Sequence, residues 1–384
     1  MSRPLKAGII GTGFIGGVHA RAARQAGAHL AGVVSSTPER SRVAADALGA
    51  DRAFTSPEDL IGDDDIDVVH ICTPNHLHAP LAIRALAAGK HVICEKPLAL
   101  SAAEAARLVA AAEDAGRVAA VPFVYRYYPL VREARERLHS GKAGPLRLMH
   151  GSYLQDWMLR EDDDNWRVDA ALGGASRAFA DIGSHWCDLA QFMARQRIVR
   201  VSARKLVAHP ERRRGEGAAS FTNGSGAAGI PTSVDTEDAM FVHFETGDGV
   251  LGSVTISQVS PGRKNRLWIE LDAGEESLVF NQEEPETLWC GRRESATILW
   301  RDPAQLSSAG GRMTALPAGH PEGYASCFDA FVRDTYAAIA TGDTPEGLPT
   351  FADGLAAASI TDAVLASADS EQWTEVDQHT PHAT

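Results

Sequence analysis

The amino-acid sequence predicts two domains, an α/β domain with a doubly wound parallel sheet and an α+β domain with a large, open, mainly antiparallel sheet. Three observations lead to this prediction. The chain has 384 residues, and domains average about 150 residues. Up to residue 125, short apolar runs alternate with helical stretches, which is typical of βαβ units. Beyond that point strands follow one another through turns. We therefore expect domains at 1–125 and 126–384, with the last helix able to pack back on the first domain.

The first domain contains five predicted strands separated by helices or turns. Its first helix opens directly after a glycine-rich turn and runs to about Ala26. A later helix starts after Ser101, where Glu104 three residues on completes a capping box. The strands are expected at residues 5–10, 29–34, 67–72, 91–94 and 118–121, and further helices at 38–48 and 76–88.

The second domain is predicted to be an antiparallel sheet of five or six strands with helices on one face. Alternating apolar and polar residues mark the strands, and turns such as Gly247-Asp248-Gly249 separate them, as hairpins require. The segment 211–233 is rich in glycine, serine and alanine, and we expect a mobile loop because it has few large apolar groups to bury. The strands are expected at 199–207, 239–244, 250–258, 267–271 and 277–280, and the helices at 131–138, 182–195, 324–340 and 351–366.

Composition excludes several classes of protein. With 37 basic and 50 acidic residues the formal charge is -13, so the chain has no overall electrostatic footprint for nucleic acid or an anionic membrane. No apolar run reaches the roughly 18 residues of a membrane-spanning helix. The five cysteines are scattered and lack a CxxC pair, which favours reduced thiols. We expect a cytoplasmic protein, because the first strand begins too close to the N-terminus to leave room for a signal peptide.

A glycine-rich motif, GTGFIG, directly follows the first predicted strand and opens a helix, which is the context that gives the GxGxxG pattern its meaning. The first glycine permits a tight turn, the second lets the backbone approach a pyrophosphate, and the third lets the helix pack on the strand. The motif predicts a Rossmann-type dinucleotide site. Its expected cofactor-binding residues are Gly11, Thr12, Gly13, Phe14, Ile15 and Gly16.

The end of the second strand bears on the choice between NAD and NADP. NAD enzymes commonly place an acidic residue there to bind the ribose hydroxyls. This chain has Ser35, Ser36 and Thr37 instead, with Arg40 and Arg42 just beyond. Hydroxyls with an arginine suit a 2′-phosphate, so we expect a preference for NADP over NAD. The alternative is that both arginines are solvated helix residues.

Two further loops are expected at the same edge of the parallel sheet. The third strand is followed by Thr73, Pro74, Asn75 and His78, which should border the cofactor. The fourth strand ends at Glu95 and Lys96, stiffened by Pro97. We expect Lys96 to donate a hydrogen bond to the substrate oxygen and stabilise charge there. Glu95 is expected to pair with Lys96 or to touch the nicotinamide ribose.

A carboxylate and an imidazole share one helix face in the second domain. Asp181 and His185 are four residues apart and could form a proton relay near neutral pH. One alternative is an N-cap aspartate with a histidine satisfied in the core. Zinc is a third option, but histidine or cysteine partners at the usual spacings are lacking, so no metal is predicted.

Aromatic and polar side chains in the second half are typical of a sugar site. Tyr125 and Arg126 stand at the domain junction, and Gln155, Asp156 and Trp157 follow later. Amide and carboxylate groups can bind hydroxyls, while aromatic faces cover the C–H surface of a pyranose. Packing and loop capping are the alternative interpretation. Trp166 and Arg167, further along the chain, are expected to bind the cofactor.

The motifs GTGFIG, TPNHLH, CEKPLA and DIGSHWCD, in this order, resemble the Gfo/Idh/MocA family of sugar and cyclitol oxidoreductases. The resemblance covers essentially the whole chain. It implies Lys96, Asp181 and His185 as the catalytic set, with His185 as the acid/base. The segment YLQDW, with Trp166 and Arg167, is similar to pyranoside dehydrogenases of the family. The second-strand tail, VSSTPER, is similar to an NADP-binding tail.

The expected function is an NAD(P)-dependent dehydrogenase that oxidises a secondary alcohol of a sugar, glycoside or cyclitol. Two alternatives remain, an NAD-dependent glycoside hydrolase of the same family and a non-catalytic, dinucleotide-gated sugar sensor. A homodimer or homotetramer packed through the open sheet is also expected, because that sheet leaves one apolar face to cover.

Overall fold

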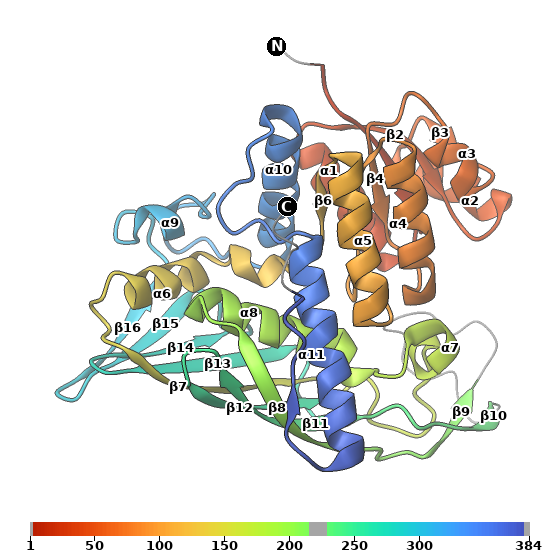
Figure 1. Ribbon diagram of the computed structural model, residues 1–384. Helices are drawn as coiled ribbons and strands as arrows, with labels where there is room; N and C mark the ends of the chain where they lie inside the picture. The colour runs from red at the N-terminus through yellow and green to blue at the C-terminus, as the bar shows by residue number, and fades with distance from the viewer. Residues whose placement is uncertain (1–2, 215–228, 380–384) are drawn as a thin grey trace. The chain divides into compact units, whose positions relative to one another are not determined.

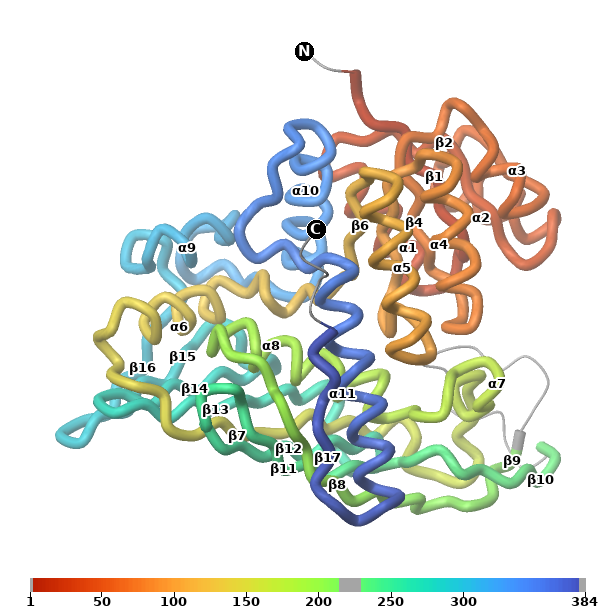
Figure 2. Tube along the Cα trace, viewed as in Figure 1, coloured from red at the N-terminus to blue at the C-terminus, as the bar shows by residue number. Residues whose placement is uncertain are grey.

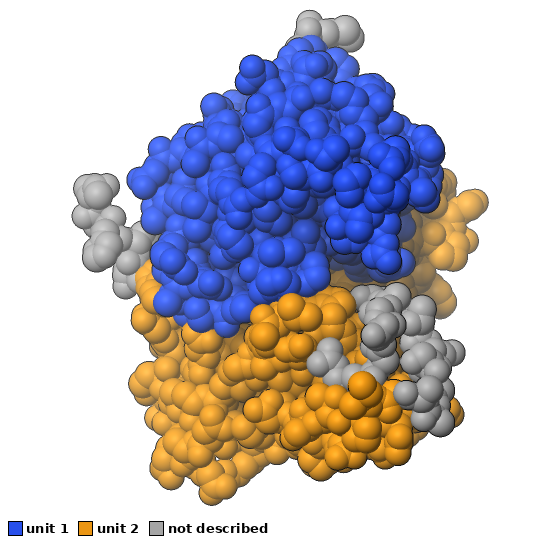
Figure 3. Space-filling view, turned by 90° about the vertical axis from the view of Figure 1, so that its right-hand side faces the viewer, with its two compact units in different colours: residues 1–124, 324–355 blue, residues 125–323, 356–384 orange. Residues whose placement is uncertain are grey.

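Two structural units make up the chain, and Figure 3 colours them separately. The computed structural model describes residues 3–214 and 229–379. The first unit comprises residues 1–124 with 324–355, and the second comprises residues 125–323 with 356–384.

The first unit contains a six-stranded parallel sheet in the order β3-β2-β1-β4-β5-β6. The order reverses between β1 and β4, which is the position where doubly wound sheets bind ligands. The short inner strands are almost wholly apolar and buried, as expected for a sheet covered on both faces. The doubly wound prediction is therefore confirmed, with β3 as an additional strand. The strands are β1 Lys6–Ile10, β2 His29–Val34, β3 Arg52–Ala53, β4 Val68–Ile71, β5 His91–Cys94 and β6 Ala119–Ala120.

Helices cover this sheet on both faces. Helix α1 packs with α10, and α4 packs with α5 (Figure 1). The side chains of Thr37, Ser56 and Ser101 cap α2, α3 and α5 by accepting a backbone N–H three residues on. Glu104 reaches back to the N–H of Leu100. The helices are α1 Phe14–Gln25, α2 Pro38–Leu48, α3 Pro57–Ile61, α4 His78–Ala87, α5 Ala102–Ala115 and α10 Tyr324–Thr341.

The second unit contains a nine-stranded sheet in the order β16-β15-β14-β13-β7-β12-β11-β8-β17. The predicted five or six strands were too few, because β7, β15, β16 and β17 lack a clear alternation of apolar and polar residues. β7 pairs parallel with β12 and antiparallel with β13, so the sheet is mixed but mainly antiparallel. The strands are β7 Leu146–Leu154, β8 Ile198–Leu206, β11 Ala239–Thr246, β12 Leu251–Ser257, β13 Arg266–Ala273, β14 Ser277–Asn281, β15 Thr287–Gly291, β16 Ala296–Trp300 and β17 Thr374–Glu375.

One face of this sheet is covered by helices α6 and α8, which pack against each other (Figure 2). The apolar strand residues on that face, such as Met149 and Phe280, are fully buried. The shorter helices α7 and α9 complete the unit. The bounds are α6 Pro129–His139, α7 Ala170–Gly173, α8 Ser184–Ala194 and α9 Ser308–Gly311.

The segment 211–233 is not a loop throughout. β9 Glu211–Arg214 pairs antiparallel with β10 Ile230–Ser233, so both ends of the expected mobile loop are strands. Arg212 anchors β9, because its buried guanidinium donates to the main-chain oxygen of Met158 and to the carboxylate of Asp238. Residues 215–228, on which the rest of that prediction falls, lie outside the described residues.

Helix α11, Phe351–Ser370, contributes its first residues to the first unit and the rest to the second. By length and composition it is the one helix among residues 3–214 and 229–379 that could cross a membrane. Of its most apolar window, 56% is buried, as in a core helix that passes the same test. The helix is therefore weak evidence for a membrane span.

Candidate functional site

The glycine-rich turn after β1 has the shape that a dinucleotide pyrophosphate needs. Gly11 has a φ of +94°, and a Cβ there would lie 2.5 Å from the carbonyl oxygen of Cys72. A Cβ at Gly16 would lie 2.1 Å from the oxygen of Gly11, whereas one at Gly13 would meet no heavy atom within 4 Å. Gly13 starts α1 without a side-chain cap. The turn thus fits a phosphate group, which backbone N–H groups and the helix dipole favour.

Hydroxyl groups and one arginine gather at the end of β2. Thr12 Oγ1 donates to Ser35 Oγ at 2.9 Å, and Arg40 donates to Ser36 Oγ at 3.1 Å. Arg42, by contrast, donates to the carboxylate of Glu39 at 2.9 Å. The two predicted arginines therefore differ, since Arg40 lies with the hydroxyls and Arg42 has an acidic partner on its own helix.

The loop after β4 is held by His78. Its Nδ1 lies 2.8 Å from the carbonyl oxygen of Pro97, and its Nε2 lies 2.9 Å from that of Thr73. The buried imidazole thus joins the loops that follow β4 and β5. Asn75 is also buried, in a 3-10 turn that precedes α4.

The end of β5 is organised by the Glu95 side chain, which is buried. One carboxylate oxygen accepts the main-chain N–H of Lys96 at 3.1 Å, and the other lies 3.1 Å from His19 Nε2. Burial would raise the pKa of Glu95, but the hydrogen bond and attraction from His19, with the Lys96 charge nearby, outweigh burial and lower it. Glu95 is therefore a carboxylate that fixes the main chain at Lys96.

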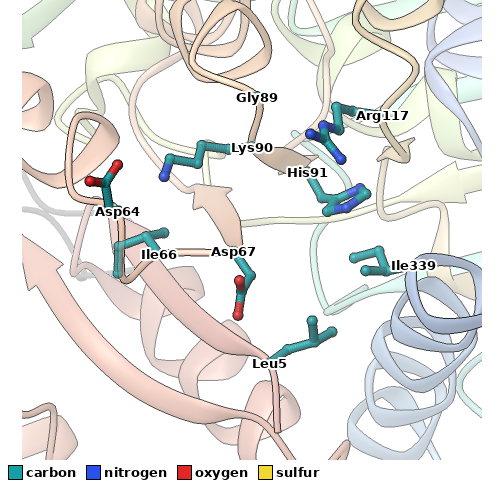
Figure 4. A pocket seen from close by; sticks show the side chains of 9 residues that line it. All are labelled: Leu5, Asp64, Ile66, Asp67, Gly89, Lys90, His91, Arg117 and Ile339. Carbon is teal, nitrogen blue, oxygen red and sulfur yellow. The ribbon is translucent and has the colours of Figure 1, made fainter. Parts of the chain in front are cut away.

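A pocket of about 260 Å³ lies at the opposite edge of the same sheet (Figure 4). Leu5, Asp67 and Arg117 each precede a strand, and His91 begins one. These residues mark the amino ends of the strands. We do not assign this pocket to the cofactor, because the glycine turn, Ser35 and Lys96 all lie at carboxyl ends.

In the second unit, Asp181 lies in a π-helical turn, Phe179–Gly183, that runs directly into α8. Single π turns within helices are frequent at functional sites. His185 follows in the first turn of α8, and both side chains are buried. Asp181 Oδ2 accepts from Gln258 Nε2 at 2.9 Å, and Asp181 Oδ1 lies 3.6 Å from Arg167 Nε.

The start of this helical segment is fixed by Glu237, which is almost fully buried. Its Oε1 accepts from Ser176 Oγ at 2.7 Å and from the main-chain N–H of Phe179 at 2.8 Å. Gly173 allows the Arg167 main chain to come close, since a Cβ there would lie 2.8 Å from the Arg167 carbonyl oxygen. The segment that carries Asp181 is therefore held by buried hydrogen bonds at its start.

A chain of uncharged hydrogen-bonding groups begins beside His185. The Tyr125 ring lies 4.9 Å from the His185 ring, and the Tyr125 hydroxyl lies 2.6 Å from that of Tyr153. Tyr153 donates to Asn265 Oδ1 at 2.7 Å, and so does Gln155 Nε2 at 2.8 Å. Since Tyr153 donates its proton to Asn265, Tyr125 is the donor in the bond between the two hydroxyls.

The same chain includes Trp157, whose indole N–H donates to Gln155 Oε1 at 2.7 Å. Trp166 contributes an indole face over which the Arg167 guanidinium lies, 4.4 Å from the ring centroid. Of the predicted substrate residues, Tyr125, Gln155 and Trp157 are thus brought together.

Two predicted substrate residues instead make ion pairs. Arg126 pairs with the buried carboxylate of Asp188, and Asp156 accepts from Lys264 at 2.7 Å. The Arg126 guanidinium also lies 5.0 Å from the Phe192 ring centroid. Arg126 therefore has a structural role in tying its segment to α8. A role in binding substrate stays a prediction.

Sequence reasoning missed Gln258 and Asn265. β7 and β12 are parallel, so Gln155 and Gln258, which follow them, meet at one edge of the sheet. Asn265 precedes β13, which is antiparallel to β7, and so its position is at the same edge. The position of Gln258 at a strand end was visible in the sequence, but its parallel neighbour β7 was not predicted.

Comparison with known proteins agrees with both units. Residues 5–123 match the oxidoreductase family described as having an NAD-binding Rossmann fold, and residues 131–276 match a GFO/IDH/MocA C-terminal domain. Levoglucosan dehydrogenase from Pseudarthrobacter phenanthrenivorans is 33% identical over 393 residues, which cover 97% of this chain and 98% of that one. The chain belongs to the Gfo/Idh/MocA family of oxidoreductases.

Other members of the Gfo/Idh/MocA family are similar over much of the chain. D-xylose 1-dehydrogenase (NADP(+)) 2 from Haloferax volcanii is 32% identical over 256 residues, 66% of this chain and 77% of that one. The solved structure of levoglucosan dehydrogenase in complex with NADH and levoglucosan has a TM-score of 0.88 at 31% identity, covering 98% of this chain and 100% of that one. The predicted family and fold class are confirmed.

Proposed function

We propose that this oxidoreductase is an NAD(P)-dependent dehydrogenase that acts on a secondary alcohol of a sugar, glycoside or cyclitol. The observation that carries the proposal is the neighbourhood of His185, where Tyr125 begins a chain of hydroxyl and amide groups. Such groups match the hydroxyls of a polyol, and the imidazole is a suitable proton acceptor near neutral pH.

The proposed roles follow from the chemistry of the side chains. His185 accepts the proton of the substrate hydroxyl, and Lys96 donates a hydrogen bond to the same oxygen. Asp181 stabilises the imidazolium that forms. A bound nicotinamide would take the hydride from the carbon that carries this hydroxyl. Lys96 belongs to the first unit, while Asp181 and His185 belong to the second.

The function is tested by mixing monosaccharides, anhydrosugars, glycosides and inositols with each nucleotide and following absorbance of the reduced form. A dehydrogenase forms one reduced nucleotide for each alcohol oxidised. A glycoside hydrolase that oxidises its substrate transiently leaves no net reduced nucleotide. A sensor binds sugar without redox change, so either of those results contradicts the proposal.

We further propose that NADP is preferred, with Arg40 and the neighbouring hydroxyls binding the 2′-phosphate. The Arg40→Ala variant should weaken NADPH binding by about 10- to 100-fold, as expected for charge-assisted hydrogen bonds, and leave NADH binding nearly unchanged. Arg42→Ala is the matched control, because Arg42 pairs with Glu39. Fluorescence titration with each nucleotide measures the two dissociation constants. Tighter binding of NADH than of NADPH by the unaltered protein would contradict the preference.

A second copy of the chain is proposed to cover the outer face of the nine-stranded sheet. Phe241 and Leu251 are about half exposed there on adjacent strands β11 and β12, and burying them would stabilise a homodimer or homotetramer. Phe241→Asp with Leu251→Glu should reduce the mass measured by light scattering to that of the monomer. Val43→Glu, on the exposed side of α2, is the control. A monomeric unaltered protein at micromolar concentration contradicts this proposal.

We also propose a cytoplasmic location. All five cysteines are buried and form no disulfide, as suits a reducing compartment.

A further inference from the structure

A line of three buried side chains ends at the Glu95 carboxylate. His19 Nε2 lies 3.1 Å from Glu95 Oε1, and His19 Nδ1 lies 2.9 Å from His70 Nδ1. His70 Nε2 lies 2.7 Å from the hydroxyl of Tyr336. These side chains come from α1, β4 and α10, all within the first unit.

The line is closed to solvent. His19 and His70 are both 0% exposed, and Tyr336 is 5% exposed. The His19 ring packs edge-on against His70 and Phe328, with centroids 5.1 and 4.9 Å away. Polar groups this deeply buried are costly unless each is hydrogen-bonded. The three short contacts meet that requirement.

The carboxylate fixes where the protons lie. Glu95 can only accept, so His19 must carry a proton on Nε2. A single proton is then shared between the two Nδ1 atoms. If His70 holds it, His70 Nε2 accepts from the Tyr336 hydroxyl. If His19 holds it, His70 Nε2 donates to the same hydroxyl. Burial lowers the pKa of His70 well below its usual value, so His70 is neutral in either case.

Glu95 connects this line of hydrogen bonds to the turn that follows β5. Its second oxygen accepts the main-chain N–H of Lys96. Burial, and next the charge of Glu95, raise the pKa values of the Cys72 and Cys94 thiols, which therefore stay protonated. Of these three acidic groups Glu95 is thus the ionised one, and His19 is the hydrogen-bond donor that orients its carboxylate.

We propose that His19, supported by His70 and Tyr336, is a positioning residue that holds the Glu95 carboxylate and, through it, the Lys96 main chain in the catalytic geometry. The inference rests on the proposed function insofar as it takes Lys96 as catalytic. It adds that α10, through Tyr336, takes part in ordering a turn that follows β5.

Two amide variants of His19 form a matched pair. In His19→Gln the amide nitrogen reaches the position of Nε2 and can still donate to Glu95. In His19→Asn the amide matches Nδ1 and faces His70 instead. Because misplacing a catalytic group by about 1 Å can cost 100-fold, His19→Asn should lower kcat by about 10- to 100-fold, and His19→Gln should restore most of it. Nucleotide dissociation constants should change by less than about threefold in both.

Tyr336→Phe removes only the distal hydroxyl and keeps the ring. It should lower kcat about two- to fivefold, because a single net hydrogen bond contributes little. His29→Gln alters a half-exposed histidine that pairs with Asp51 and is the control expected to match the unaltered protein. Equal kcat values for the Gln and Asn variants of His19, or an unchanged kcat for His19→Asn, would overturn the positioning role.

A measurement without substrate separates this inference from the proposed function. The protein is labelled with ¹⁵N-histidine, and the His19 and His70 signals are assigned from variants of each residue. The NMR spectrum should show a slowly exchanging proton on His19 Nε2. In Glu95→Gln this signal should be lost or should exchange faster. If Lys96→Met stays fully active, the role proposed for Lys96 fails, and if no compound of the sugar panel yields reduced nucleotide, the proposed function fails. In both cases this hydrogen bond remains testable. A His19 without a proton on Nε2 overturns the hydrogen-bond line itself.

Discussion

Replacement of Lys96 by methionine, or of His185 by alanine, is expected to lower kcat by about 10²- to 10⁴-fold, the range typical for losing an acid/base or a charge-stabilising donor. Without His185 the substrate hydroxyl loses the imidazole that is proposed to accept its proton. Without the Lys96 ammonium, charge on the substrate oxygen is no longer stabilised. Steady-state rates with a substrate found in the sugar panel measure the effect.

Two controls isolate the chemistry from general damage. Lys205→Met alters a surface ion pair with Asp369 and should leave kcat unchanged, as should His29→Ala. Nucleotide binding by the His185 variant should match that of the unaltered protein, because the glycine turn is untouched. Near-normal oxidation by either catalytic variant is the outcome that contradicts the assignment of these residues.

The Asp188→Ala variant is expected to lower the free energy of unfolding by about 3–5 kcal/mol, the usual effect of leaving a buried charge without its partner. The side chains of Arg126 and Asp188 are 8% and 5% exposed, and Arg126 donates to both carboxylate oxygens. Removing the carboxylate leaves the guanidinium charge buried without its acidic partner, beside apolar groups such as Phe192. Urea unfolding followed by tryptophan fluorescence suits the measurement, since all seven tryptophans lie in the second unit.

Asp369→Ala removes the exposed carboxylate partner of Lys205 and should cost less than about 1 kcal/mol, which makes it the matched control. The double variant Arg126→Met with Asp188→Leu should recover much of the lost stability, because an apolar pair of similar volume needs no desolvation of charges. A loss below about 1 kcal/mol in Asp188→Ala would show that the pair is solvated rather than buried.

The first unit could be predicted largely from the sequence because its signals are local. The glycine turn, the caps at Thr37 and Ser101 and the apolar strands each identify their own element within a few residues. β7 could not be predicted in the same way. A glycine stands at position 151, where a Cβ would lie 2.1 Å from the Trp268 carbonyl oxygen and 2.7 Å from Trp186 Nε1. The close approach of β13 and α8 thus requires a glycine where a large apolar residue would have marked the strand.

The candidate site was only partly predictable for the same physical reason. Asp181 and His185 could be found from their spacing of four residues on a predicted helix. Tyr336 and His70, by contrast, are 266 positions apart in the sequence. Gln258 and Asn265 join the site through the register of β7, β12 and β13. Contacts set by strand register or by a distant helix leave no short-range pattern.

The return of residues 324–355 to the first unit has a consequence for biosynthesis. The ribosome completes β6 long before it reaches α10, so α1 and His70 emerge without the helix that covers and satisfies them. Domains generally fold as they are made, from the N-terminus onward. The first unit, however, is complete only after nearly the whole polypeptide has been synthesised. A nascent chain that stops before Tyr324 carries every nucleotide motif and still lacks the helix that completes their support.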